Sequence, residues 1–182
     1  VMMRLFAGET VTKHTDWFTC EEAVLQMKPY SKFPVAVASS LSPSGSKLAG
    51  RYGTGLLSIA ATEPAAFHVL DYNYSVWQDE ASRHGHSVTR DQWRLMGPMH
   101  IAETEKQARE NCRYGLQWVF EYLSHIIPMG DPNDPPPPSD FDDFVDFANE
   151  TGRMVIGTPE MAIAQLSRLE EKTGGFGTYL FL

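Results

Sequence analysis

The 182-residue sequence has few cysteines, little basic charge and no long apolar run, and each shortage excludes a class of protein. Cys20 and Cys112 lie far apart, which predicts a reducing, cytoplasmic location and no disulfide framework. Neither has a partner at a metal-ligand spacing. A net charge of -8 and a pI near 5.2 argue against nucleic-acid and anionic-membrane partners. No apolar run approaches the roughly 18 residues of a membrane span.

The remaining composition is that of an ordinary globular protein. Hydrophobic residues make up 42% of the chain and charged residues 21%. The length suffices for a sizeable core, so we expect one domain over residues 1–182. The triplet His84-Gly85-His86 matches no metal site well and is typical of the last turn of a helix. We therefore predict no metal.

The chain is organised around a strand–loop–helix–strand pattern. Val35–Ala38 is a short apolar run typical of a buried strand, and Leu56–Ile59 is a second one. Between them a loop of Ser, Gly and Pro, residues 39–45, precedes a helical segment, Lys47–Tyr52. This βαβ pattern predicts a parallel sheet.

The loop before this helix has the features of an anion site. Ser42 is expected to be the N-cap, with Pro43 at the first helical position, where its missing N–H costs nothing. The free amides of Ser44 and Gly45 then point out of the helix start, and Gly45 lets an anion approach closely. Such a start is a ready phosphate site. The alternative is a capped helix after a turn that binds nothing.

The rest of the chain continues the alternation of strands and helices. We expect strands at Trp93–Ala102 and Thr178–Leu182, and helices from Thr62 to about His84, from a capping box at Thr104 to Pro128, over Phe141–Asn149, and from Thr158 to Gly174. Four strands alternating with helices are half of an eight-stranded (β/α) barrel, which would leave two apolar sheet edges. We therefore expect a truncated chain, or one whose missing half comes from a second subunit.

Two features outside the loop are candidates for function. His100, near Glu103, lies towards the carboxyl end of the third expected strand, where a parallel barrel places its chemistry. A histidine at a strand end is more often structural, so His100 is no more than a candidate catalytic residue. Residues 128–140 hold six of the twelve prolines. We expect this segment to be an excursion within one domain and a candidate lid.

Short motifs spread along nearly the whole chain carry a family resemblance. They include Gly-Thr-Pro-Glu at 157–160, Gly-Gly-Phe-Gly at 174–177, and the stretches 8–12, 15–18, 35–40, 42–43, 49–50, 53–59, 93–95, 97–104 and 162–165. Each is weak alone, and together they are specific. The chain resembles the C-terminal half of bacterial luciferase-like flavin monooxygenases, in particular the limonene 1,2-monooxygenase type.

The resemblance implies an α/β fold, a partial (β/α)8 barrel containing about strands 5 to 8. It implies reduced FMN supplied by a separate flavin reductase, O2, a small apolar substrate such as a terpene, and a homo-oligomer. Ser42 and Gly45 match the loop that holds the FMN phosphate, and Ser39 and Ser40 match the strand end beneath the flavin. The resemblance assigns no catalytic residue here, because the family's catalytic histidine belongs to its first four strands.

Two alternatives remain open at the level of the sequence. An F420-dependent oxidoreductase of the same fold would use the same phosphate loop for the longer tail of its cofactor. A non-catalytic flavin-binding protein would retain flavin without turnover. If the loop holds phosphate, a Gly45→Glu exchange is expected to remove flavin affinity.

Overall fold

The computed structural model describes residues 1–126 and 136–182. By its internal contacts the chain divides into two compact units, Val1–Pro34 and Val35–Leu182. The single domain stays a prediction, because compact units of this kind can belong to one domain. Most of the Pro-rich segment 128–140 lies outside the described residues, so its role as a lid also stays a prediction.

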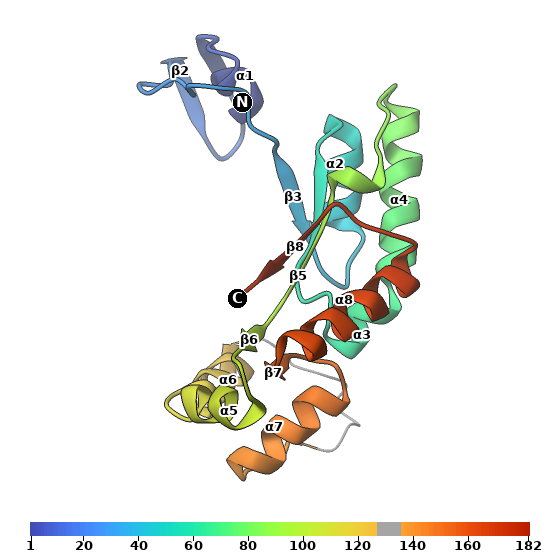
Figure 1. Cartoon of the computed structure of the whole chain (residues 1–182). Coiled ribbons are helices and arrows are strands. Elements are labelled where there is room, and N and C mark those ends of the chain that lie inside the picture. The colour runs from blue at the N-terminus through green and yellow to red at the C-terminus, as the bar shows by residue number, and fades with distance from the viewer. Residues whose placement is uncertain (127–135) are drawn as a thin grey trace. The chain divides into compact units, whose positions relative to one another are not determined.

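The first unit is a short helix followed by an antiparallel hairpin (Figure 1). α1 spans Met2–Phe6, β1 spans Val11–His14 and β2 spans Thr19–Ala23. Thr15 closes the hairpin turn, since its hydroxyl donates to Phe18 O at 2.8 Å and accepts from Phe18 N at 3.0 Å. The rings of Phe6 and Phe33, with centroids 5.2 Å apart, join the two ends of this unit. Contacts within this unit therefore close its hairpin and join its two ends to each other.

The second unit alternates strands with helices. Its strands are β3 Ala36–Ser39, β4 Gly55–Ser58, β5 Trp93–Gly97, β6 Met99–Ile101, β7 Val155–Gly157 and β8 Thr178–Phe181. Its described helices are α2 Ser44–Tyr52, α3 Pro64–His68, α4 Leu70–Arg83, the 3-10 helix η1 Arg90–Gln92, α5 Glu105–Cys112, α6 Leu116–Ile126, α7 Phe141–Glu150 and α8 Pro159–Thr173. The predicted α/β class is confirmed.

The main sheet is parallel, with strand order β3-β4-β5-β8. Ser39 lies opposite Ser58, Ser58 opposite Leu95, and Leu95 opposite Tyr179. Because the four strands run the same way, their carboxyl ends share one edge, as in half of a (β/α)8 barrel. The loop that follows β3 therefore opens at this edge.

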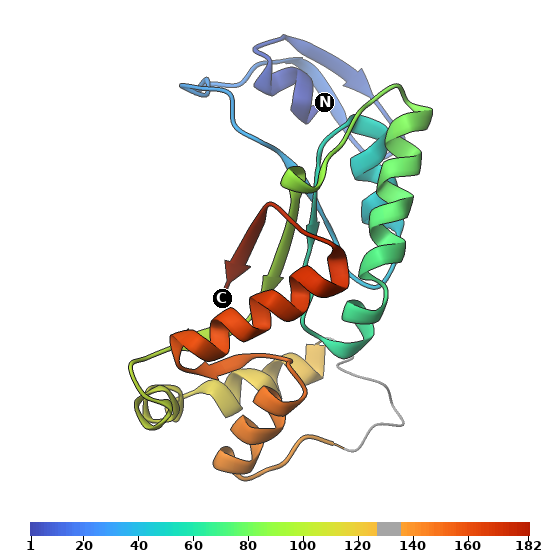
Figure 2. The same cartoon turned by 45° about the vertical axis from the view of Figure 1, so that its right-hand side comes forward.

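Helices cover one face of the main sheet (Figure 2). One buried cluster joins α2, α4 and α8 to the strands, through Ala49, Leu56, Leu70, Tyr74, Trp77, Trp93, Leu95 and Leu169. Tyr74 stacks on Trp93 with ring centroids 4.7 Å apart, and the Arg90 guanidinium lies 4.4 Å from the centre of the Tyr74 ring. Trp93 Nε1 donates to Ser58 Oγ at 2.9 Å, so this buried indole is satisfied.

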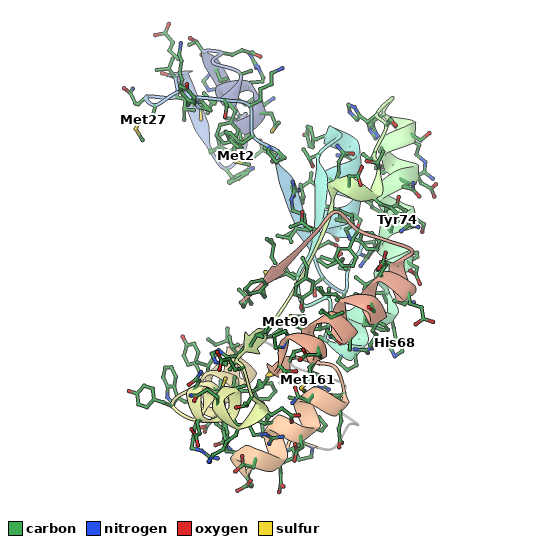
Figure 3. All side chains as sticks on the ribbon, viewed as in Figure 1. Met2, Met27, His68, Tyr74, Met99 and Met161 are labelled. Atoms are coloured by element: carbon green, nitrogen blue, oxygen red, sulfur yellow. The ribbon has the colours of Figure 1, made fainter. Side chains whose placement is uncertain are left out.

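The third expected strand, Trp93–Ala102, is two strands, because Pro98 interrupts it. Proline has no N–H for the ladder, so β5 stays in the main sheet while β6 pairs in parallel with β7. The Pro98 carbonyl accepts from Val155 N at 3.2 Å, which starts that second pairing. The β6–β7 pair packs on α8, where Met99 and Met161 lie close together (Figure 3).

The helix expected from Thr62 to about His84 is two helices, α3 and α4, interrupted at Val69. Thr62 does not cap it, because its hydroxyl donates to Arg153 O at 2.7 Å. Glu63 is the N-cap, so the helix starts one residue later than a Thr62 cap would give, with Pro64 at the first helical position. A contact across 91 residues thus displaces a cap that local sequence favours.

The helix expected from Thr104 to Pro128 is also interrupted. Thr104 caps α5 as predicted and accepts from Gln107 N at 3.2 Å. The chain leaves α5 after Cys112 and re-enters a helix at α6, with φ of 124° at Gly115. That backbone conformation requires glycine and ends a regular helix. Gly174, with φ of 67°, ends α8 as predicted.

α2 packs against α4 so closely that a methyl group does not fit at Gly50. A Cβ on Gly50 would lie 2.7 Å from Trp77 O and 2.8 Å from Ala81 N. Trp77 Nε1 also donates to Thr54 O at 3.0 Å, just beyond the end of α2. The contact with α4 therefore determines how α2 lies on the sheet.

Gly50→Ala is expected to lower the free energy of unfolding by about 1–3 kcal/mol, because the added methyl overpacks this contact. Helix propensity alone favours Ala by about 1 kcal/mol and would act in the opposite direction. Urea unfolding of the natural full-length protein measures the difference. Lys47→Ala, exposed on the same helix, is the matched control and should stay within about 0.5 kcal/mol of wild type. A more stable Gly50→Ala protein would contradict the close contact.

Burial raises the pKa of Tyr179 to about 12, and its hydroxyl has no hydrogen-bond partner among the described residues. In the unfolded chain a tyrosine titrates near about 10. The fold therefore disfavours the ionised form and loses stability as the pH rises from about 10 to about 12, with no effect at lower pH. In Tyr179→Phe this decline should be smaller, as measured by urea midpoints across that range. An unchanged decline would contradict the burial of this hydroxyl.

Candidate functional site

The candidate site is the loop from β3 to α2, at the carboxyl edge of the main sheet. Ser39 ends β3 and α2 begins at Ser44, so four residues separate the strand end from the first helical residue. In parallel α/β sheets this edge carries the binding sites, because the strand ends and the helix starts meet there. The structure thus brings all the predicted phosphate-site residues into one short loop.

The start of α2 presents free backbone donors. Pro43, and not Ser42, is the N-cap, so the expected start was early by one residue. Lys47 N bonds to Pro43 O at 2.9 Å and is the first amide that the helix itself satisfies. The amides of Ser44, Gly45 and Ser46 precede it and point out of the helix start, where the helix dipole favours an anion.

The serine hydroxyls of the loop mainly bond to one another. Ser39 Oγ donates to Ser42 O at 3.0 Å and lies 3.4 Å from Ser46 Oγ. Ser42 Oγ lies 2.7 Å from Ser44 Oγ and accepts from Ser44 N at 3.3 Å. The buried Ser39 therefore shapes the loop, whereas the exposed Ser42 and Ser44 can turn their hydroxyls to a ligand.

Gly45 is required by packing against β3. A Cβ there would lie 2.2 Å from Ala38 O and 2.8 Å from Ser39 Cβ. The Gly45→Glu exchange therefore cannot test phosphate binding, because any side chain at this position disturbs the strand end whether or not an anion binds. Glycine at position 45 therefore lets helix α2 approach strand β3 closely.

Asn73 is a part of the site that the sequence analysis missed. It lies on α4, is 1% exposed, and donates from Nδ2 to Ser40 O at 2.7 Å. The sequence did hold a signal, since Asn73 is a polar residue within the buried stripe that Leu70, Tyr74 and Trp77 form along α4. α4 thus holds the loop at Ser40.

The charge around the loop suits an anion. Between residues 34 and 62 the sequence carries Lys47 and Arg51 but neither Asp nor Glu, and Arg51 lies 4.0 Å from the carboxylate of Glu80 on α4. Free amides, small hydroxyls and the absence of carboxylates in this stretch fit a phosphate group. Within residues 1–126 and 136–182, no group of three His, Cys, Asp or Glu side chains could hold a metal ion.

His100 lies on β6, outside the main sheet. Its Nε2 lies 3.0 Å from Asn111 Nδ2, and Asn111 Oδ1 accepts from Gln107 Nε2 at 2.7 Å. An amide nitrogen can only donate, so Nε2 is the acceptor and the neutral ring carries its proton on Nδ1. The hydrogen bond of His100 among the described residues thus goes to α5 and not to the loop, and its catalytic role stays a prediction.

Comparison with known proteins places the chain in a family. The sequence profile of the luciferase-like monooxygenases matches residues 1–175. The chain belongs to this family. It is 50% identical over 182 residues to limonene 1,2-monooxygenase of Rhodococcus erythropolis, which covers 100% of this chain and 46% of that protein. It is 33% identical over 189 residues to 4-hydroxyprotoasukamycin monooxygenase of Streptomyces nodosus subsp. asukaensis, which covers 99% of this chain and 49% of that protein.

Solved structures of low identity share the fold of this luciferase-like monooxygenase chain. The monooxygenase RslO1 from Streptomyces bottropensis matches with a TM-score of 0.72 at 19% identity, over 98% of this chain and 50% of that one. The oxygenating constituent of 3,6-diketocamphane monooxygenase from Pseudomonas putida, in complex with FMN, matches with a TM-score of 0.62 at 19% identity, over 99% of this chain and 53% of that one. An F420-dependent secondary alcohol dehydrogenase, in complex with an F420–acetone adduct, matches with a TM-score of 0.62 at 21% identity, over 99% of this chain and 52% of that one.

These matches confirm the family resemblance and the partial luciferase-like barrel that the motifs predicted. The chain spans about half the length of the curated relatives it matches. Over the part of the chain that the structure describes, no helix is both long and apolar enough to cross a membrane.

Proposed function

We propose that the protein carrying this chain is a flavin-dependent monooxygenase, which uses reduced FMN and O2 to oxygenate an apolar, terpene-like substrate. The observation that carries the proposal is the start of α2 at the carboxyl edge of the sheet, where the amides of Gly45 and Ser46 have no partner among the described residues and that of Ser44 donates only to the exposed Ser42 hydroxyl. Its membership of the luciferase-like monooxygenase family supports the reaction class. Relatives that share 50% and 33% identity are named as monooxygenases.

The chain's own contribution is to hold the phosphate end of FMN. The amides of Ser44, Gly45 and Ser46 donate to phosphate oxygens, and the hydroxyls of Ser42 and Ser44 can add bonds at the rim. The bound cofactor supplies the electrons and activates O2. An FMN-bound structure of similar fold supports FMN as the cofactor.

The sheet face opposite the helices supports an apolar substrate. Leu57, Met96 and Leu180 alternate along their strands with the residues that pack on the helices, so they lie on the other face. In a (β/α)8 barrel that face lines the interior, beside the edge where the loop opens. Arg94 shares this face and gives it one polar feature. The R. erythropolis relative, named for limonene, supports a terpene-like substrate.

The proposal includes partners. A separate flavin reductase would supply reduced FMN, in line with the two-component type of the structural neighbour named an oxygenating constituent. A homo-oligomer and a cytoplasmic location belong to the same proposal, the latter from the two widely separated cysteines, which are both free thiols.

F420 is the second candidate cofactor. The F420-dependent alcohol dehydrogenase covers 99% of this chain at a TM-score of 0.62, as close as the FMN-bound structure. A cofactor of this kind also carries a phosphate that the start of α2 could hold. In that case the protein would transfer hydride to or from its substrate and would not use O2.

The proposed activity can be tested with the natural full-length protein, a flavin reductase, NADH, FMN and limonene. We expect O2 uptake that depends on the reductase, and a product that carries one oxygen atom from labelled O2. Mixtures without the protein, with catalase present, measure uncoupled oxidation. Turnover with reduced F420 in the absence of O2 would favour the second candidate. Retained flavin without product on any terpene would favour a non-catalytic flavin-binding protein.

The phosphate assignment can be tested at Ser44, the exposed first residue of α2. A carboxylate in the first turn suits the helix dipole, so Ser44→Glu should keep the fold. It should weaken FMN binding at least about tenfold, because two anions then share one site. Ser44→Gln has the same size without the charge and should lose less than about threefold. Fluorescence titration measures both affinities, and equal losses for the two variants would contradict a phosphate at this helix start.

A further inference from the structure

The buried face of α4 carries one polar residue that its neighbours do not explain. Leu70, Tyr74, Trp77 and Ala81 are buried and apolar or aromatic, whereas Asn73, in the same stripe, is an amide with 1% exposure. Asn73 Oδ1 is buried and has no hydrogen-bond partner among the described residues. An unpaired buried carbonyl oxygen costs free energy, so a leucine here would pack at a lower cost.

The other half of the Asn73 amide is used. Nδ2 donates to Ser40 O at 2.7 Å, across 33 residues of sequence. Ser40 follows β3 directly and is the first residue of the loop that leads to Ser44, where α2 begins. Flipping the amide would satisfy neither atom, because two carbonyl oxygens would then face each other. The observed orientation keeps the hydrogen bond to Ser40 O and leaves Oδ1 as the buried atom without a partner among the described residues.

We propose that Asn73 is a positioning residue for the phosphate site, a role that rests on the proposed function. By holding the Ser40 carbonyl, it fixes the path of the loop between the strand end and Pro43. The amides of Ser44, Gly45 and Ser46 then converge on one anion without rearrangement when it binds. Asn73 itself does not touch the phosphate.

The loop needs a hydrogen bond from outside because the hydrogen bonds within it join residues that are close in sequence. Ser39 Oγ to Ser42 O and Ser42 Oγ to Ser44 Oγ both connect residues two or three apart. They can persist while the loop moves as a unit. The bond from Asn73 comes from a helix that packs on the sheet and on α2, so it places the loop relative to the core.

Trp77 provides a matched comparison on the same helix face, one turn further on. Its Nε1 donates to Thr54 O at 3.0 Å, a bond of the same kind from a fully buried side chain to a backbone carbonyl. That bond lies beyond the carboxyl end of α2, away from the free amides. If Asn73 had a purely structural role, its substitution would change stability and FMN preference in the same way as substitution of Trp77.

The experiment compares the affinities of FMN and riboflavin, which differ by the phosphate alone, for the natural full-length protein. Wild type should bind FMN more tightly than riboflavin. Asn73→Leu should lose about tenfold of that preference, the value of about one hydrogen bond, with riboflavin affinity and the unfolding midpoint kept or raised. Asn73→Asp, equal in size but without the donor, should lose the preference too. Trp77→Phe should unfold more easily and keep the FMN preference.

The outcomes separate the two proposals. If wild type does not prefer FMN over riboflavin, the phosphate assignment fails, and the role of Asn73 fails with it. If wild type prefers FMN and both Asn73 variants keep that preference, the positioning role alone is overturned. A loss of FMN preference in Trp77→Phe as large as in Asn73→Leu would also overturn it, because both residues would then act through general stability.

Discussion

The site depends on the close packing of α2 between the end of β3 and α4. At Gly45 a Cβ would lie 2.2 Å from Ala38 O, and at Gly50 it would lie 2.7 Å from Trp77 O. Glycine at these two positions lets the helix approach the strand end on one side and its neighbouring helix on the other. The amides at the start of α2 are therefore held at the sheet edge by this packing and by the bond from Asn73 to Ser40 O, and no charged side chain is needed to aim them.

A site made of backbone donors has a physical advantage and a physical requirement. Its amides are oriented before the ligand arrives, so binding pays little for reorganisation. The requirement is that nothing else in the loop competes for them. Here Ser39 bonds to Ser42 O, and Ser42 and Ser44 share a hydroxyl contact. These bonds leave the amides of Gly45 and Ser46 available to an anion, whereas the Ser44 amide donates to the exposed Ser42 Oγ at 3.3 Å.

Much of this arrangement was predictable from local sequence. The βαβ pattern and the helix after the serine loop follow from apolar periodicity and turn residues, and the start of α2 was missed by one residue only. The family was predictable from motifs spread along the chain. Features set by distant contacts were not predictable, since Thr62 leaves its expected cap for Arg153 O and Asn73 reaches Ser40 O. Pro98 was visible in the sequence, but its effect depends on β7, which pairs with β6 from more than 50 residues away.

In the proposed function, the residues that hold the phosphate of the flavin differ from those that surround its reacting ring. Every part of the proposed phosphate site, from Ser39 to Ser46 together with Asn73, lies within one βαβ unit and α4, the second helix after it. The isoalloxazine ring of a bound flavin would be held by residues other than this loop, and Leu57, Arg94 and Met96, which share one face of the main sheet, are candidates. Under the proposed function, contacts within these described residues would determine how tightly the phosphate is held, whereas turnover would depend on the other residues that line that face. For this reason the preference for FMN over riboflavin measures the loop directly, and the rate of oxygenation does not.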